Sequence, residues 1–497
     1  MKNMATHFWL AVAVVVSAVT SGLAEEPLKL EGRRELFVDQ TLIGSLDGSA
    51  EMVLHVPHDE GEVFKFDKPW EGLFAGYVTM LYVDGKYMLY YRGMPKAGSD
   101  GTTIESTCYA ESTDGENWTR PNLGLYEYDG SKDNNIILAQ LAPFSHNFCP
   151  FYDTNPDADP KQRFKAIAGT KRTELHGFVS PDGIHWTKLQ DGPVLTDPKG
   201  AYDSQNVAFW SESEKCYVAY YRYFYKGKRT IARATSTDFV HWDEPVYMSY
   251  SDTDSLVPAN HLYTNQTHPY FRAPHIYIAT AARFMPGRRV LTPQQAKEVG
   301  VHPSYFNDTA DAVFMTTRGG DRYDCTFEQG FVRPGPALGN WVSRTNYPVL
   351  NVVPTGDYEM SLYVNQEYGQ PTANIHRYSL RLDGFASVQA RGEKGSVTTK
   401  PLTFTGDQLA INFATSAAGS IQVEIQDAEG NPIPGYTLKD ASETIGNAID
   451  RPVRWKEKGY DVSELAGKTV RLKFVLDDAD IYAFQFQSAG KKQLANK

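Results

Sequence analysis

A short motif recurs three times along this chain, and its spacing limits the fold more than any other feature. The motif is a serine, an aspartate two positions later and a tryptophan four positions after the aspartate, and its copies begin at Ser112, Ser180 and Ser236. The three aspartates are 68 and 56 residues apart, a period typical of a supersecondary unit repeated in an array. We therefore expect repeated sheets, in which each aspartate caps a tight turn and each tryptophan packs on the sheet below.

Alternating apolar and polar residues predict groups of three antiparallel strands around each motif. The groups are 77–83, 86–91 and 107–112; 148–153, 164–168 and 176–180; 206–211, 216–221 and 231–236; 267–271, 276–284 and 311–317; and 348–353, 360–365 and 374–382. No helix of ten residues is expected between them. This pattern predicts a five-bladed β-propeller over residues 25–392, closed by a strand from residues 33–60.

The pattern changes after Leu402 to alternating strands separated by glycine, asparagine and proline turns. It predicts a β-sandwich over residues 393–490, so that the fold class is all-β. This second domain has no group of histidines, cysteines or carboxylates in catalytic spacing. We expect it to support the propeller, and carbohydrate binding is the other role left open.

Residues 1–24 have a lysine near the start, an apolar stretch and a small-residue exit, which is the layout of a secretory signal peptide. We expect a secreted or periplasmic protein. No later stretch has the length of a membrane span. The four cysteines lack the C-x-x-C spacing of zinc and redox motifs, and we expect free thiols in strands. The cysteines are Cys108, Cys149, Cys216 and Cys325.

The formal net charge of −11 disfavours a general attraction to nucleic acid or to anionic lipid. An anionic ligand would therefore have to be held by local arginines. The sequence predicts neither a cofactor nor a metal-binding motif, although it leaves open a Ca²⁺ ion on the propeller axis. The oligomeric state is not determined.

The repeated turns, the five predicted blades and the added sandwich together resemble the secreted glycoside hydrolases of families 32 and 43. At the level of sequence, residues 84–91 resemble the second strand of the first blade in those enzymes, and residues 207–210 resemble the strand that follows their R-D-P element. The resemblance implies a carbohydrate substrate bound at one face of the propeller.

The catalytic motifs of family 32 are not matched. Its nucleophile lies in W-M-N-D-P-N-G, whereas the corresponding segment here, residues 74–78, contains no acid. In place of R-D-P this chain has Ser204-Gln205-Asn206, with Asp203 just before it. The family's E-C pair is missing, so the resemblance transfers no catalytic triad.

Candidate site residues come instead from the strand topology. In an antiparallel meander the start of the first strand, the end of the second and the start of the third lie at one edge of the sheet. Glycoside hydrolysis requires a proton-donating carboxyl group and a second carboxylate about 5 to 9.5 Å away. Asp203 and Glu71 form the leading pair, and Glu105 and Glu174 are the substitutes.

Other polar residues at the same edge are predicted to bind substrate. His146 is a ligand for sugar hydroxyls or a proton carrier, and Arg92, Arg222 and Arg283 occupy equivalent places at the ends of second strands. The remaining predicted ligands are Asn147, Gln205, Asn206, Asn265 and Arg344. The long loop 286–310, with a helix signal after Thr292, is predicted to form a lid or a wall of the site.

These observations predict a hydrolase that acts on a poly- or oligosaccharide by paired-carboxylate chemistry, and the arginines extend the prediction to an anionic sugar. Two alternatives remain open. One is a non-catalytic carbohydrate-binding propeller, and the other is a sialidase-like enzyme, although sialidases have six blades and a tyrosine nucleophile.

Overall fold

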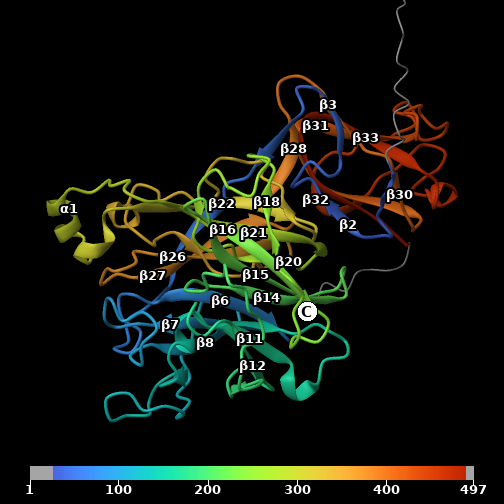
Figure 1. Ribbon diagram of the computed structural model, residues 1–497. Helices are drawn as coiled ribbons and strands as arrows, with labels where there is room; N and C mark the ends of the chain where they lie inside the picture. The colour runs from blue at the N-terminus through green and yellow to red at the C-terminus, as the bar shows by residue number, and fades with distance from the viewer. Residues whose placement is uncertain (1–25, 489–497) are drawn as a thin grey trace, which may run out of the picture.

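The computed structural model describes residues 26–488, and in this part of the chain it is almost entirely β (Figure 1). The predicted signal peptide, 1–24, lies outside the described residues. The only α-helix among the described residues is α1 (Pro293–Glu298), capped by Thr292 as the sequence predicts. None of the described helices has the length and apolar character needed to cross a membrane.

Five antiparallel sheets form the propeller, which confirms the predicted number of blades. The first blade consists of β6 (Gly76–Val83), β7 (Lys86–Gly93), β8 (Ser106–Ser112) and β9 (Ile136–Ala139). The second consists of β10 (Cys149–Tyr152), β11 (Phe164–Ala168), β12 (His176–Ser180) and β13 (Thr187–Lys188). The third consists of β14 (Val207–Ser211), β15 (Cys216–Tyr225), β16 (Lys228–Ser236) and β17 (Val246–Tyr247).

The last two blades are less regular. In the fourth, β19 (His261–Leu262) and β20 (Thr267–Tyr270) both pair with the long β21 (Ala273–Met285), which also pairs with β22 (Thr309–Thr317). Beside it, β18 (Ser249–Tyr250) pairs with β23 (Arg322–Tyr323). The fifth contains β24 (Tyr347–Pro348), β25 (Val353–Pro354), β26 (Glu359–Gln366), β27 (Asn374–Arg381) and β5 (His58–Lys65).

Strand β5 closes the ring, because this N-terminal segment pairs with β27 of the last blade. The sequence predicts the closing strand within residues 33–60, and the structure places it slightly later. The described strands ahead of β5 pair with strands outside the five blades.

The sandwich domain is built from both ends of the chain. Its N-terminal strands are β1 (Leu28–Lys29), β2 (Arg34–Leu36), β3 (Ile43–Gly48) and β4 (Glu51–Leu54). Its C-terminal strands are β28 (Ala386–Ala390), β29 (Gly395–Thr399), β30 (Leu402–Thr403), β31 (Gln408–Asp427), β32 (Asn447–Pro452) and β33 (Val470–Gln487). Figure 1 shows the blue strands β2 and β3 among the orange and red strands β28, β31 and β33.

These pairings correct the predicted domain boundary, which assigned residues 25–392 to the propeller. Strands β2, β3 and β4 pair with β33, β29 and β28, respectively, and β28 itself lies before residue 393. Alternation along a strand shows which face is buried but not which sheet accepts the strand, so the partner was not readable from the sequence. The long strands β31 and β33 shift register twice against each other, and they share one apolar core around the fully buried Trp455.

The recurring turns have the predicted structure. In each, the aspartate side chain accepts hydrogen bonds from two backbone N–H groups that follow it, at 2.8 to 2.9 Å. These bonds, together with those from neighbouring side chains, hold the pKa of Asp182 at about 2, below its usual value, although burial opposes the shift. Trp186 and Trp242 each donate an indole N–H to a carbonyl oxygen of their own turn. Trp118 packs instead against Phe64 of the closing strand.

Five short segments of the described chain form 3₁₀ turns. They are η1 (Phe144–His146), η2 (Pro160–Gln162), η3 (Pro303–Tyr305), η4 (Leu338–Asn340) and η5 (Ser463–Leu465). Two of these turns, η1 and η3, carry side chains to the mouth of the propeller.

All four cysteines are free thiols, as predicted, and three of them lie in strands.

Candidate functional site at the propeller mouth

Tyr77, the second residue of β6, is the side chain around which the propeller mouth is built. Its φ of 49° is a left-handed conformation that bulky residues rarely adopt, and such strain is concentrated at functional sites. Its ring packs edge-on against His146 at 5.5 Å and beneath the Arg92 guanidinium at 4.6 Å. Its hydroxyl donates to the backbone oxygen of Asp203 at 3.4 Å. Tyr77 therefore connects the second and third blades across the mouth.

Burial raises the pKa of Tyr77 well above its ordinary value, and the neighbouring Tyr263 adds to this effect. The arginines around it act in the opposite direction without overcoming burial. The side chain is therefore a neutral phenol at physiological pH, suited to packing and hydrogen bonding.

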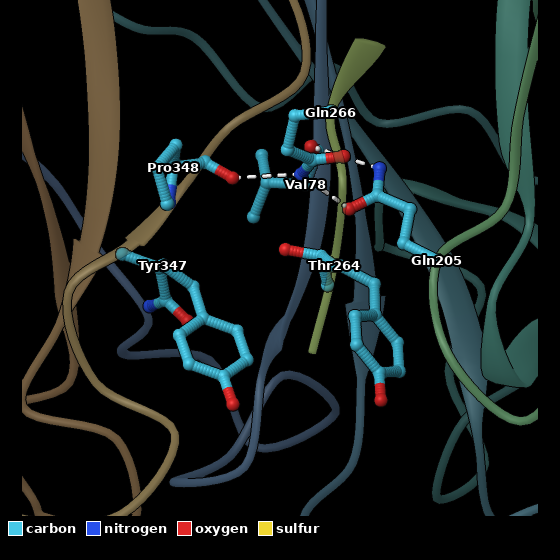
Figure 2. Close-up of a pocket in the computed structure, with 8 residues that line it drawn as sticks. Val78, Gln205, Thr264, Gln266, Tyr347 and Pro348 are labelled. Carbon is cyan, nitrogen blue, oxygen red and sulfur yellow. Dashed lines mark hydrogen bonds between the residues drawn. The ribbon is translucent and has the colours of Figure 1, made fainter. Parts of the chain in front are cut away.

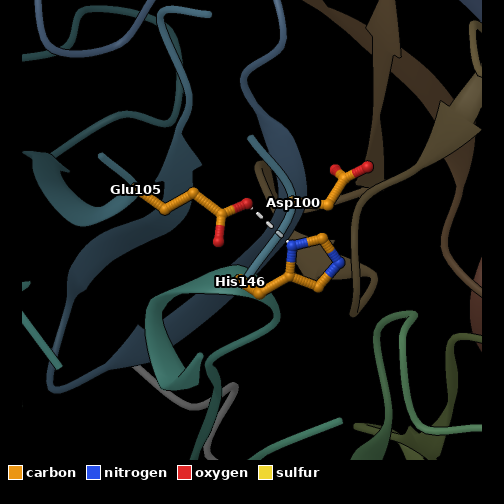
Figure 3. Close-up of side chains that lie close together, drawn as sticks. All are labelled: Asp100, Glu105 and His146. Atoms are coloured by element: carbon orange, nitrogen blue, oxygen red, sulfur yellow. Dashed lines mark hydrogen bonds and ion pairs between the residues drawn. The ribbon is translucent and has the colours of Figure 1, made fainter. Parts of the chain in front are cut away.

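His146 and Glu105 form a buried pair beside Tyr77. Glu105, in the loop between β7 and β8, is completely buried, and its Oε1 lies 2.7 Å from Nδ1 of His146 in η1 (Figure 3). The other oxygen of Glu105 accepts the backbone N–H of Gly101 at 2.8 Å. A carboxylate on Nδ1 fixes the orientation of the ring and leaves Nε2 for proton transfer.

The same corner brings together Asp100, Glu105 and His146, whose ligand atoms lie within 4.8 Å of one another. Histidine and carboxylate ligands would suit a divalent metal. However, Nη1 of Arg92 lies 3.9 Å from both carboxylates and 3.3 Å from Nδ1 of His146. A guanidinium already supplies positive charge here, so these residues do not fit a metal site.

Asp203 is the most exposed of the predicted acids, with 62 % of its side chain accessible. It forms an ion pair with Arg222, whose own side chain is 4 % exposed and also donates from Nε to the oxygen of Ala201 at 3.2 Å. The charged carboxylate is thus anchored from below while its open side faces solvent. This arrangement is what a base or a nucleophile requires.

Two glutamines form the floor of the mouth. Gln205 donates to the Val78 oxygen at 3.1 Å, and it accepts a hydrogen bond from Gln266 at 2.8 Å (Figure 2). Gln266 in turn donates to the Pro348 oxygen at 2.7 Å. The predicted ligand Gln205 therefore joins the inner ends of the blades, at the base of a small pocket that Tyr347 also lines.

The sequence predicts Glu71 as a catalytic residue of the mouth, but the structure does not place its side chain there. Its side chain is completely buried, with Oε1 accepting from the Tyr91 hydroxyl at 2.5 Å and from Nε of Arg120 at 2.7 Å. Oε2 accepts from the Lys68 backbone and from Arg120. Every lobe of the carboxylate is occupied, so this geometry gives Glu71 a structural role in the first blade.

Replacing Glu71 by glutamine is expected to destabilise the protein by about 3 kcal/mol, because the largely buried Arg120 would lose its buried carboxylate and keep only the half-exposed Asp67, 3.5 Å away, as an ionic partner. The urea midpoint should fall, while the activity of the folded fraction should stay at the wild-type level. Loss of activity at unchanged stability would show instead that Glu71 takes part in the chemistry.

Four residues that the sequence predicts to bind substrate instead make ion pairs or hydrogen bonds within the fold. Arg283 forms a two-pronged ion pair with Asp311 at 2.8 and 2.5 Å, so its charge is neutralised. The buried amides of the predicted asparagines bond to backbone groups of neighbouring loops and strands; these residues are Asn147, Asn206 and Asn265. The recurrence of asparagine at this edge is thus a repeated turn device.

Glu174 differs from the other predicted acids because its carboxylate is not held by a partner side chain within residues 26–488. Its backbone is left-handed, with φ of 60°, and its carboxylate makes no hydrogen bond or ion pair with the described residues. It lies near Tyr202, whose pKa is raised first by burial and then by Asp197 and Glu174. The structure shows no contact between Glu174 and Asp203.

The sequence did not identify several side chains of the mouth as site residues. Tyr77 was interpreted as a strand residue, and Tyr347 and Arg229 were not singled out. No local signal reports the left-handed backbone of Tyr77, which is known only from the folded chain. For Arg229 a signal existed, since it stands opposite Phe224 in the β15–β16 hairpin, at the same edge as Arg222.

The long loop 286–310 forms part of the wall, as predicted. Its residues Leu291, Ala296 and Tyr305 pack in a cluster with Phe74 and Tyr368 of the mouth. This packing fixes the loop over the first and fifth blades.

The chain resembles several solved structures at low similarity. One is identified as a glycoside hydrolase, with 13% identity and a TM-score of 0.42, and the match covers 66% of this chain and 92% of that one. An N-acetylgalactosamine deacetylase from F. plautii, solved with blood group B trisaccharide, has 11% identity and a TM-score of 0.43, with 68% and 97% covered. A GH32 β-fructofuranosidase of Bombyx mori has 10% identity and a TM-score of 0.41, with 86% and 94% covered.

No protein-family model and no curated protein sequence matches the chain. Because identities and TM-scores are this low, none of the three structures assigns an activity to this protein.

Proposed function

We propose that this protein is a glycoside hydrolase that cleaves a poly- or oligosaccharide at the mouth of the propeller. One observation carries the proposal: Tyr77 contacts both the ring of His146 and the backbone of Asp203. A proton-transfer group and the residue that carries an exposed carboxylate therefore both adjoin one strained side chain, and hydrolysis of a glycosidic bond requires a proton donor together with such a carboxylate.

The surroundings suit a sugar. Several tyrosines border the mouth, and their rings offer apolar faces to the C–H groups of a sugar, while their hydroxyls and nearby amides suit its hydroxyl groups. The tyrosines and the amide that line the pocket next to Arg344 are Tyr77, Tyr347, Tyr368 and Asn365.

In this mechanism His146 donates a proton from Nε2 to the leaving oxygen, and Glu105 holds the ring through Nδ1. Asp203 acts in its ionised form, either on an attacking water or directly on the anomeric carbon. Arg222 forms an ion pair with that carboxylate and holds it in place. Water completes the reaction, so that one glycosidic bond is replaced by two hydroxyl groups.

Release of reducing sugar from a panel of poly- and oligosaccharides tests the proposal with the full chain. Replacing Asp203 by asparagine is expected to lower turnover about 100-fold or more, and to change the affinity for the sugar only a few-fold. The matched control is Asp254→Asn, because Asp254 is also an exposed partner of an arginine, Arg322, away from the mouth.

The control variant should keep wild-type turnover. If the wild-type chain binds a glycan of the panel but releases no sugar, the carbohydrate-binding alternative is correct. If Asp203→Asn retains wild-type turnover, the proposed chemistry is wrong.

A further inference from the structure

Three arginines converge on one aromatic ring at the side of the mouth formed by the third, fourth and fifth blades. The guanidinium carbons of Arg222 in β15, Arg229 in β16 and Arg344 before β24 lie 5.1, 4.9 and 5.8 Å from the centre of the Tyr263 ring. Cation–π contacts of this kind partly offset the cost of gathering like charges. These contacts do not neutralise the three positive charges.

Among the described residues, carboxylates do not balance the three positive charges of this arginine cluster. Asp203 pairs with Arg222 alone. Arg229 has one polar side-chain partner, Nδ1 of His261 at 3.4 Å, and Arg344 has no hydrogen-bond or ion-pair partner in the described chain. Burial, followed by Arg229, lowers the pKa of His261, so this ring is neutral at physiological pH and adds no charge.

Unused hydrogen-bond donors lie in the same area. Nη1 of Arg222, Oγ1 of Thr264 and the hydroxyl of Tyr347 are buried without a partner. Tyr347 and Arg344 line one pocket, and Figure 2 shows the Tyr347 hydroxyl directed away from the glutamine floor. Buried polar groups in native proteins are nearly always satisfied, so orphaned donors beside unpaired cations indicate a missing acceptor.

The backbone of Arg344 gives a third indication. Its φ of 59° is left-handed, and its side chain is held between the rings of Tyr263 and Tyr305. A strained backbone that fixes an unpaired cation at a pocket is costly for stability and is retained where a ligand uses it.

We infer that this arginine cluster is a subsite for an anionic group of the carbohydrate, either the carboxylate of a uronic acid or a sulfate ester. The inference rests on the proposed function only for the ligand being a carbohydrate. A planar guanidinium binds either oxyanion through two parallel hydrogen bonds. In a chain of net charge −11, long-range repulsion of anions makes such a local cluster necessary for binding.

Equilibrium binding to matched glycans tests the inference without using turnover. The background is the full chain carrying His146→Gln, so that any cleavage of the glycan during the measurement is slowed at least about 100-fold. The probes are an array of neutral oligosaccharides with their uronic and sulfated counterparts. The test variant is Arg344→Asn, because asparagine tolerates a left-handed backbone and the fold is preserved. Arg229→Gln is the second variant.

Removal of one charge-assisted pair is expected to weaken binding of the charged glycan about 10- to 100-fold, with little change for the neutral counterpart. The control Arg322→Gln, at an exposed ion pair with Asp254, should change neither. Preference for the uronic or for the sulfated probe identifies the group. Equal affinity of the wild-type background for neutral and charged probes, or equal losses for both in Arg344→Asn and Arg229→Gln, overturns the inference. Neither result bears on whether the wild-type chain hydrolyses a glycan.

Discussion

Replacing His146 by glutamine is expected to lower kcat for glycan hydrolysis by about 10²- to 10⁴-fold, the usual contribution of a positioned general acid or base. Glutamine retains hydrogen-bonding capacity toward Glu105 but cannot exchange a proton near neutral pH. Since His146 packs against Tyr77 and pairs with a fully buried carboxylate, its Nε2 is the proton carrier best positioned in the mouth. Steady-state kinetics on the cleaved glycan would measure the effect.

The pH dependence of kcat adds a readout that a merely structural role would not change. The His146→Gln profile should lose one of its two limbs, whereas Glu105→Gln, which removes the partner that positions the ring, should lower kcat while both limbs remain. His185 supplies the matched control, because its Nδ1 lies 2.7 Å from Asp182 in an exposed outer turn. His185→Gln should leave kcat unchanged. Retention of both limbs in His146→Gln would exclude His146 as the proton carrier.

Replacing Asp383 by asparagine is expected to lower the stability of the protein by about 3 to 5 kcal/mol. Asp383 is completely buried where the propeller meets the sandwich domain, and it pairs with Arg34 at 3.1 Å and Arg272 at 3.4 Å. It also accepts hydrogen bonds from the Tyr270 hydroxyl at 2.8 Å and from Asn412 at 2.9 Å. Asparagine keeps the shape and tolerates the left-handed φ of 64°, so the change isolates the charge.

Urea unfolding followed at neutral and acidic pH measures the effect of Asp383→Asn. Burial opposes ionisation of Asp383, but the two arginines outweigh it and hold its pKa below the ordinary value of 3.8. The stabilisation is therefore complete above about pH 3.8 and is lost as the pH falls through the lower pKa of the folded state. The variant should accordingly lose less stability than the wild type on acidification. Asp254→Asn, at an exposed pair, should change stability by less than about 1 kcal/mol.

Local patterns in the sequence were sufficient for most of the propeller. The serine–aspartate turns could be derived because their hydrogen bonds connect residues two or three positions apart. The blade strands followed from alternation, which is also a property of neighbouring residues. The edge of the sheets at which Arg92, His146 and Asp203 lie follows from the meander topology, and the structure places all three around Tyr77.

Only the tertiary structure decided how each charged group at that edge is used. The strand topology places Glu71, Glu105, Arg222 and Arg283 at the same edge. In the folded chain Glu71 pairs with Arg120 and Arg283 with Asp311, whereas Glu105 pairs with His146 and Arg222 with the exposed Asp203. The partner Arg120 is 49 residues from Glu71, and no short-range pattern encodes such a pairing.

The domain boundary was decided in the same way, because strands β1–β4 find their partners more than 330 residues later. The sequence by itself determined the all-β class, the blades and their turns, since these depend on interactions within one hairpin. The tertiary structure decided the pairing of buried charges, the left-handed backbone at Tyr77 and Arg344 and the grouping of arginines around Tyr263, because each depends on packing between blades.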